Sequence, residues 1–369
     1  MYLEYLIAAI ALIPIYIFMI RGLNLKLSTA FNIYFYRSLF SIAYIFYANN
    51  DYADANTYIQ GGGNIERGIL GSELLTTFIY LSSKYLSIKG YALYSLFGLL
   101  GTVGCCYLYC AIKKCDIRGF KKITYVSALF CFLPSLTFWT CSPGKDSISF
   151  FLITYALYSY VQLNDNSLKI NMKIIIAAIL LLLIRPHIGA SLIVGYGISF
   201  ANQIKKKKYL YLRITILIIL SLTFWILIPF LQNFAGVNAN NIIYGFYLLE
   251  ERFSQTTVEN VNSNYISRVI FFLFTPFPKI SLNPLYLADY VNTVFITYYL
   301  FSIIKDEKSY RNITGNPFFL FSIILLLLLP VITFNPGVAT RQKWMFLPAL
   351  IVSLKKNRYL NYEKIRKLN

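Results

Sequence analysis

The sequence contains few charged residues and little that marks a common enzyme site. Asp, Glu, Lys and Arg make up 13% of the 369 residues, and His187 is the only histidine. The sequence has no glycine-rich phosphate loop, no cluster of metal ligands and no Ser-His-Asp arrangement. We therefore expect a protein that uses neither a metal nor another cofactor.

Cysteine is also scarce, and its spacing indicates no special chemistry. The six cysteines form neither a CxxC pair nor a zinc-binding pattern. Most of them lie within apolar runs, where a thiol packs as a small hydrophobic group. We interpret these residues as packing residues: Cys105, Cys106, Cys110, Cys115, Cys131 and Cys141.

Long hydrophobic runs fill most of the chain. The sequence is 57% hydrophobic, and its mean hydropathy is +0.58. Runs of about 17 to 23 apolar residues recur, which is the length that crosses a bilayer as a helix. The first run lacks a basic start and a small-residue cleavage site, so we interpret it as a membrane span rather than a signal peptide. The expected spans are, in order, Tyr2–Ile20, Phe31–Ala48, Tyr91–Ile112, Ile123–Cys141, Ser147–Leu163, the two arms of a hairpin at 173–208, Tyr209–Leu231, Leu285–Ile304, Phe318–Phe334 and Gly337–Leu354.

These runs predict an all-α, polytopic membrane protein in which residues 1–369 form a single transmembrane domain. We expect about eleven spans, with the N-terminus outside and the C-terminus inside. Two long polar segments, 49–89 and 232–284, then lie on the extracytoplasmic side, and the amphipathic stretch 70–86 is expected to lie along the interface.

The basic charge follows this topology. A net charge of +19 in a soluble protein would suggest binding to nucleic acid. Here most lysines and arginines fall in the expected inner loops and the C-terminal tail, as in the four consecutive lysines Lys205 to Lys208. This placement is the positive-inside bias of a multi-pass protein of the plasma membrane. We expect contact with membrane lipid and no nucleic-acid partner.

One apolar run contains an unusual interruption. Arg185-Pro186-His187 divides the stretch 173–208 into two hydrocarbon-like halves. A charge at membrane depth costs at least about 2.5 kcal/mol, so it usually lines a polar cavity. Proline breaks the helical hydrogen-bond ladder at the same place. We expect two helices that meet near the outer face, with Arg185 and His187 directed into a site.

Other charged residues on the expected outer side are candidates for the same site. Lys145 and Asp146 follow a Ser-Pro-Gly turn, Arg341 lies in the last apolar run, and Asp54 lies in the first outer segment. The planar guanidinium groups of arginine suit a phosphate or pyrophosphate group. Aromatic rings on the outer face would suit a sugar.

Each candidate also has a purely structural interpretation. Arg185 could be the partner of an acid such as Asp146 or Asp54, and His187 could be a hydrogen-bonded core residue. The pair at 145–146 could form an ordinary turn with an acid at a helix start, and Arg341 could anchor its helix at the interface. Asp54 could be a solvated loop acid.

Several short motifs resemble those of Wzy-type polymerases of bacterial O-antigen and capsule. The similarity rests on Pro134-Ser135 followed by Phe138-Trp139-Thr140, on Gly144-Lys145-Asp146-Ser147, and on Arg185-Pro186-His187. The segments Phe274-Thr275-Pro276-Phe277-Pro278 and Arg341-Gln342-Lys343 fit the same pattern.

This resemblance implies an enzyme of the bacterial inner membrane that joins undecaprenyl-pyrophosphate-linked oligosaccharide repeats at the outer face. Such a glycosyltransferase-type reaction needs cations for the pyrophosphate leaving group and a base for the acceptor hydroxyl. We expect Arg185, Arg341 and Lys145 to bind pyrophosphate, and His187, Asp54 or Asp146 to be the base. A chain-length regulator protein is the expected protein partner.

Two other functions fit the same composition. A membrane glycosyltransferase that uses a polyprenyl-phosphate sugar would place the first-segment acids, Asp51 or Asp54, at its base or metal site. A flippase for lipid-linked oligosaccharide would carry its key charges at mid-membrane. The charges here gather on one side, which favours an enzyme.

Overall fold

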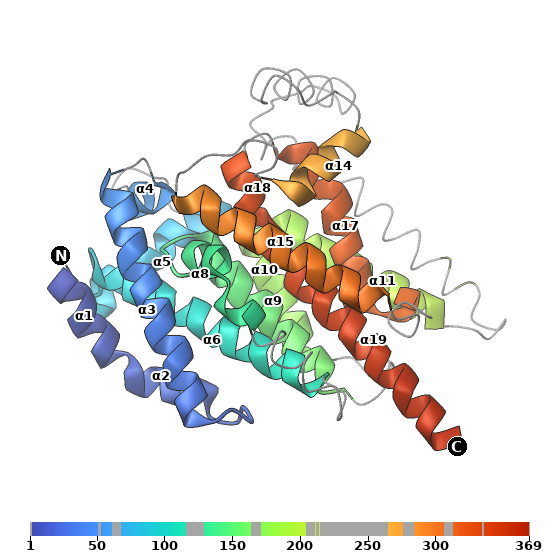
Figure 1. Ribbon diagram of the computed structural model, residues 1–369. Coiled ribbons are helices and arrows are strands. Elements are labelled where there is room, and N and C mark those ends of the chain that lie inside the picture. The colour runs from blue at the N-terminus through green and yellow to red at the C-terminus, as the bar shows by residue number, and fades with distance from the viewer. Residues whose placement is uncertain are drawn as a thin grey trace. The chain divides into compact units, whose positions relative to one another are not determined.

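The computed structural model describes residues 2–50, 53–60, 68–115, 129–163, 171–203, 211, 214, 265–275, 284–305, 313–333 and 336–368. Every regular element in these ranges is a helix, which confirms the all-α prediction for this part of the chain (Figure 1). Most of the expected span 209–231 and most of the second outer segment, 232–284, lie outside the described residues.

Contacts divide the chain into two compact units. One comprises Met1–Leu163 and Ile170–Pro186, and the other comprises Asn164–Lys169 and His187–Asn369. The single transmembrane domain over 1–369 stays a prediction. The first unit contains α1 (Tyr2–Ala11), α2 (Ile13–Ile20), α3 (Leu27–Asn50), α4 (Asp54–Gln60), α5 (Gly71–Leu86), α6 (Ala92–Lys114), the 3₁₀ turn η2 (Phe130–Phe132), α8 (Pro134–Thr140), α9 (Lys145–Val161) and α10 (Met172–Ile184).

Helix α6 is the centre of the first unit. It packs along α9 and also contacts α1 and α3 (Figure 1). Three glycines on α6 allow these close approaches, because any side chain there would meet a neighbour. A Cβ at Gly101 would lie 1.9 Å from the carbonyl oxygen of Thr140, and one at Gly104 would lie 3.0 Å from Cα of Phe151. A Cβ at Gly98 would lie 2.9 Å from Oγ of Ser41. Small residues at such positions let helix backbones pack closely.

Prolines divide two runs that we expected to be continuous spans. The run 2–20 forms α1 and α2, which bend by 42° around Leu12, just before Pro14. The described part of the run 123–141 forms η2 and the short helix α8, which begins at Pro134. Proline is tolerated in the first turn of a helix and disrupts the turn before it, so each run is broken at its proline.

Arg37 is a second departure from expectation. Its place in the expected span 31–48 predicts a side chain that reaches the inner interface. Instead, Arg37 is 1% exposed, and its Nη2 donates hydrogen bonds to the carbonyl oxygen and Oγ1 of Thr140, at 2.9 and 2.7 Å. The guanidinium therefore binds the C-terminal end of α8, where a helix favours positive charge.

The second unit includes α11 (Pro186–Gln203) from His187 onward, and it is built around α17 (Pro317–Ile332) and α19 (Leu347–Leu368). The two helices pack side by side, and Gly195 of α11 approaches the backbone of Phe321 in α17. Asn316 caps α17 by accepting hydrogen bonds from the amides of Phe318 and Phe319. The last expected span, 337–354, is divided into α18, η5 and part of α19. The described elements of the second unit are α11 (Pro186–Gln203, from His187 onward), α14 (Tyr265–Phe274), α15 (Pro284–Ile304), η4 (Ile313–Gly315), α17 (Pro317–Ile332), α18 (Pro336–Gln342), η5 (Lys343–Met345) and α19 (Leu347–Leu368).

Few of the described helices satisfy a simple test for crossing a bilayer. Only α6, with 23 residues and a mean hydropathy of 1.7, is by itself long and apolar enough among the described residues. The bent pair α1 and α2 passes if it is taken as one broken segment. This alone is weak support for a membrane protein, since a buried core helix and an N-terminal signal sequence pass the same test.

Candidate functional site

The first part of the candidate site is the turn between α8 and α9. Helix α9 begins at Lys145, and Asp146 lies in its first turn. Acids are stabilised at a helix N-terminus, where the backbone amides have no partners within the helix. Ser147 strengthens the turn by donating a hydrogen bond to the carbonyl oxygen of Gly144, at 3.0 Å. The sequence thus places one cation and one carboxylate together at the start of a buried helix.

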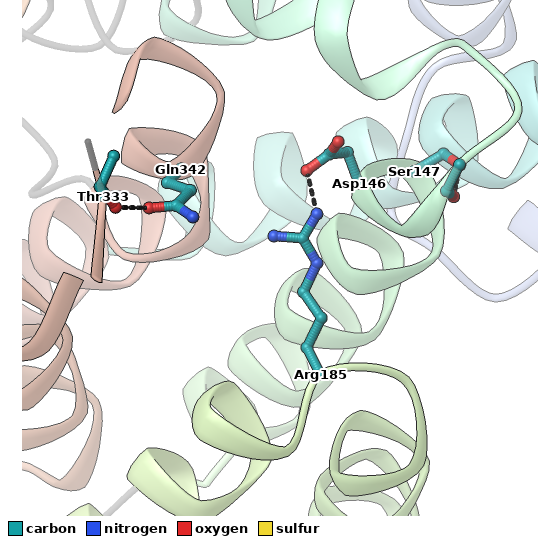
Figure 2. A network of polar contacts seen from close by, with 6 residues as sticks. Asp146, Ser147, Arg185, Thr333 and Gln342 are labelled. Atoms are coloured by element: carbon teal, nitrogen blue, oxygen red, sulfur yellow. Dashed lines mark hydrogen bonds and ion pairs between the residues drawn. The ribbon is translucent and has the colours of Figure 1, made fainter. Parts of the chain in front are cut away.

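The second part is the interruption between α10 and α11. Helix α10 ends at Ile184, Arg185 is non-helical, and Pro186 begins α11. This confirms the expected break between two helices, and its cause is local: proline disfavours a helical conformation in the residue before it. The break releases the Arg185 side chain from the helix axis toward α9 (Figure 2).

Arg185 and Asp146 form an ion pair. Nη2 of Arg185 lies 2.6 Å from Oδ1 of Asp146, and the two side chains are 10% and 17% exposed (Figure 2). Nε of Arg185 makes no hydrogen bond to the described residues. The contact between Arg185 and Asp146 is therefore the one that the structural interpretation of Arg185 predicts. The pair also holds the guanidinium in place, with its Nε donor buried.

Asp54 belongs to the same group of charges. It lies in the first turn of α4, and its charge acts on both Lys145 and Tyr58. Tyr58 is the residue of this group that sequence reasoning missed. Burial and the carboxylates of Asp54 and Asp146 raise its pKa, while Arg185 acts in the opposite direction. The signal that could have found it is its position one helical turn after Asp54.

Lys145 has an altered affinity for protons. Burial, followed by the nearby Arg185 guanidinium, lowers its pKa to about 8, and the carboxylates of Asp146 and Asp54 only partly offset this. A Cβ at Gly71, the first residue of α5, would lie 3.9 Å from Nζ of Lys145, so the ammonium also borders α5. We call Asp54, Lys145, Asp146 and Arg185 the first-unit charge cluster.

The other two candidate residues belong to the second unit. His187 is 2% exposed in the first turn of α11, and its carbonyl oxygen accepts a hydrogen bond from Ser191. Arg341 lies in the last turn of the short helix α18 and is half-buried. The meeting of Arg185 and Arg341 in one pocket stays a prediction, because each unit is described by itself. Next to Arg341, Gln342 accepts a hydrogen bond from Thr333 (Figure 2).

The first-unit charge cluster has a definite chemical character. It combines an arginine and a lysine with two carboxylates at the junction of α4, α9 and the α10–α11 break. Such a group can bind an anion through its cations and accept a proton through a carboxylate. Among the described residues, no three or more His, Cys, Asp or Glu side chains gather as metal ligands would. The prediction that no metal is used remains untested.

Comparison with protein-family models, with curated proteins and with solved structures finds no match for this chain.

Proposed function

We propose that this chain is a multi-pass protein of the bacterial inner membrane. The main support is α15, whose polarity is inverted relative to a helix of a soluble protein. Its exposed face is apolar: Val291, Val294 and Phe301 are 61%, 60% and 69% exposed. Its buried face carries Asp289 and Asn292, which are 7% and 2% exposed. In a bilayer the apolar face would contact lipid, and the polar residues would face the interior of the helix bundle.

Helix α1 supports the same proposal. Leu3, Ile7 and Ile10 lie three or four residues apart, and therefore on one face, and are 71%, 60% and 67% exposed. The orientation that we propose has α9 beginning at the outer face and Lys305, after α15, at the inner face. The first-unit charge cluster then opens to the extracytoplasmic side.

We propose further that the protein is a polymerase for undecaprenyl-pyrophosphate-linked oligosaccharide repeats. In this reaction the acceptor hydroxyl oxygen bonds to the anomeric carbon of the donor glycan. The bond from that carbon to the pyrophosphate oxygen breaks, and undecaprenyl pyrophosphate leaves with the electron pair. The hydroxyl proton passes to a carboxylate or to histidine. Pyrophosphate is a good leaving group, so cations are needed more than a general acid.

The observation that carries this proposal is the gathering of Arg185, Lys145, Asp146 and Asp54 in one group. The Arg185 and Lys145 side chains bind the pyrophosphate oxygens, and Asp146 orients the guanidinium by its 2.6 Å contact. For the proton acceptor we favour His187 or Asp54, with Asp146 as the third candidate.

Deletion of the gene tests this function, followed by electrophoresis of the surface polysaccharide. A polymerase predicts that the ladder of long chains disappears while single repeats remain. Loss of the single repeats as well would instead indicate a transferase that builds the repeat or a flippase that exports it. Arg185→Ala should reproduce the deletion, whereas Lys89→Ala, which changes an exposed cation of the first outer segment, should leave the ladder intact.

A further inference from the structure

The buried face of α15 carries polar residues that the proposed reaction has not used. Asp289, Asn292 and Thr293 are 7%, 2% and 7% exposed. Their spacing of three and four residues places them on one face of the helix. Polar groups in such a position are expensive to bury, so they usually serve a ligand or a partner.

Two other elements of the second unit meet this face. Oγ1 of Thr293 donates a hydrogen bond to the carbonyl oxygen of Thr275, which follows α14, at 3.2 Å. Nζ of Lys343, in η5, donates to the same carbonyl oxygen, and the charge of Asp289 acts on that ammonium. We call Thr275, Asp289, Asn292, Thr293 and Lys343 the α15 polar cluster.

Asn292 stands out within this cluster. Both its amide nitrogen and its amide oxygen are buried, and neither makes a hydrogen bond to the described residues. Asn316 in the same unit is the opposite case. It is 1% exposed, its oxygen accepts two backbone amides, and its nitrogen donates to the carbonyl oxygen of Ser353 at 3.3 Å. A buried carboxamide whose nitrogen and oxygen both lack a hydrogen bond destabilises the fold, so its presence calls for an explanation.

The chemistry of the cluster selects the ligand. Nζ of Lys343 already donates to the carbonyl oxygen of Thr275, so the carboxamide of Asn292 is the group of this cluster with hydrogen-bonding capacity left for a ligand. The carboxamide of Asn292 offers donors and an acceptor together, which complements a hydroxyl group that also donates and accepts. A neutral ligand rich in hydroxyl groups fits these features.

We propose that the α15 polar cluster binds hydroxyl groups of a sugar ring, with Asn292 as the principal contact. The existence of a site for a neutral hydroxylated ligand follows from the second unit alone. Its identification as a saccharide subsite rests on the proposed polymerase function. This subsite would hold part of the glycan.

The test compares Asn292→Leu with Asn316→Leu in purified protein reconstituted in lipid nanodiscs. The probe is the cell's own repeat-unit oligosaccharide, released from its lipid by mild acid. Asn292→Leu should unfold at the same or a higher temperature than the wild type, because it removes two unsatisfied groups. It should bind the probe about tenfold more weakly, the size of one good hydrogen bond. Asn316→Leu should unfold at a lower temperature, because it removes a helix cap.

Three results would overturn the proposal. They are failure of the wild type to bind the probe, unchanged binding by Asn292→Leu, and a fall in its unfolding temperature like that of Asn316→Leu. Polymerisation of lipid-linked repeats is measured in parallel, to separate the two proposals. If the wild type binds the probe but forms no polymer, the polymerase proposal fails and the subsite stands. If polymer forms and Asn292→Leu binds normally, the subsite alone fails.

Discussion

Arg185 is the residue on which the charge balance of the first unit depends. Its guanidinium contacts Asp146 at 2.6 Å, and both side chains are largely shielded from solvent. Removal of one partner leaves the other charge buried without compensation, whereas removal of both leaves an apolar surface. A stability measurement can therefore separate the strength of the ion pair from the role of either residue in catalysis.

We predict that Arg185→Met alone lowers the free energy of unfolding by about 3 kcal/mol. The double variant Arg185→Met, Asp146→Leu should recover most of that loss. Equilibrium unfolding in detergent for the wild type, both single variants and the double variant gives the coupling energy. If the double variant lost as much free energy of unfolding as the two single variants together, the ion pair would contribute no coupling energy and the prediction would be wrong.

Lys145 should make ligand binding depend on pH. Its pKa is lowered to about 8, so in the free protein the ammonium loses its proton as the pH rises through that value. Only the protonated form attracts pyrophosphate, and the affinity should therefore fall above about pH 8. Titration of inorganic pyrophosphate between neutral and alkaline pH measures this. Lys145→Arg should bind over the whole range, since arginine keeps its charge. If the affinity of the wild type for pyrophosphate did not change with pH, Lys145 would not be a residue that binds pyrophosphate.

The same shift affects stability in a defined direction. Between the lowered pKa of about 8 and the ordinary value of 10.5, the unfolded chain binds the Lys145 proton and the folded chain does not. Stability attributable to this group therefore rises with pH across that window and is constant below it.

Among the elements, the contact of α6 with the corner between α8 and α9 sets the position of Lys145 and Asp146. Gly101 allows α6 to approach Thr140, while Arg37 and Ser41 of α3 bind the carbonyl oxygens of Thr140 and Cys141. Two helices thus hold the end of α8 from which the turn begins. No sequence pattern reveals this arrangement, because Arg37 and Thr140 are 103 residues apart.

We predict that Gly101→Ala destabilises the protein by about 1–3 kcal/mol, because the added Cβ would lie 1.9 Å from the Thr140 carbonyl oxygen. Gly144→Ala is the matched control in the same corner. A Cβ at Gly144 meets no atom within 4 Å, and its φ of 165° is extended backbone that any residue adopts. Unfolding temperatures in detergent measure both variants. Equal effects of the two would contradict the packing described.

Local signals predicted helices better than they predicted breaks. The hydrophobic runs indicated α6, α9, α10 and α17 to within a few residues, and the residues around Pro186 indicated the interruption at Arg185. The breaks before Pro14 and Pro134 were missed, because long apolar runs were given more weight than single prolines. Composition alone predicts a span where the chain forms two shorter helices.

At the scale of the whole molecule, contacts between distant residues carried the information that sequence reasoning lacked. The motifs indicated Arg185, Asp146 and Lys145, but the pairing of the first two spans 39 residues and required coordinates. Asp289 and Asn292 were overlooked, because they lie within a run counted as a membrane span. Polar residues repeated on one face of an apolar helix are the signal that could have found them.

The proposed topology predicts which positions a membrane-impermeant thiol reagent can reach. All six native cysteines are buried, so the wild type should react little. Ser87→Cys and Lys305→Cys each place a thiol at an exposed position. Whole spheroplasts should label Ser87→Cys, and only permeabilised ones should label Lys305→Cys. Labelling of both in intact spheroplasts would contradict the orientation.

The most direct test of the account is polymerisation by the purified protein in lipid vesicles, with undecaprenyl-pyrophosphate-linked single repeats as the only substrate. We predict lipid-linked chains of increasing length and release of undecaprenyl pyrophosphate, both abolished by Arg185→Ala and unaffected by Lys89→Ala. Single repeats that remain unjoined with the wild type, or a full ladder with Arg185→Ala, would contradict it.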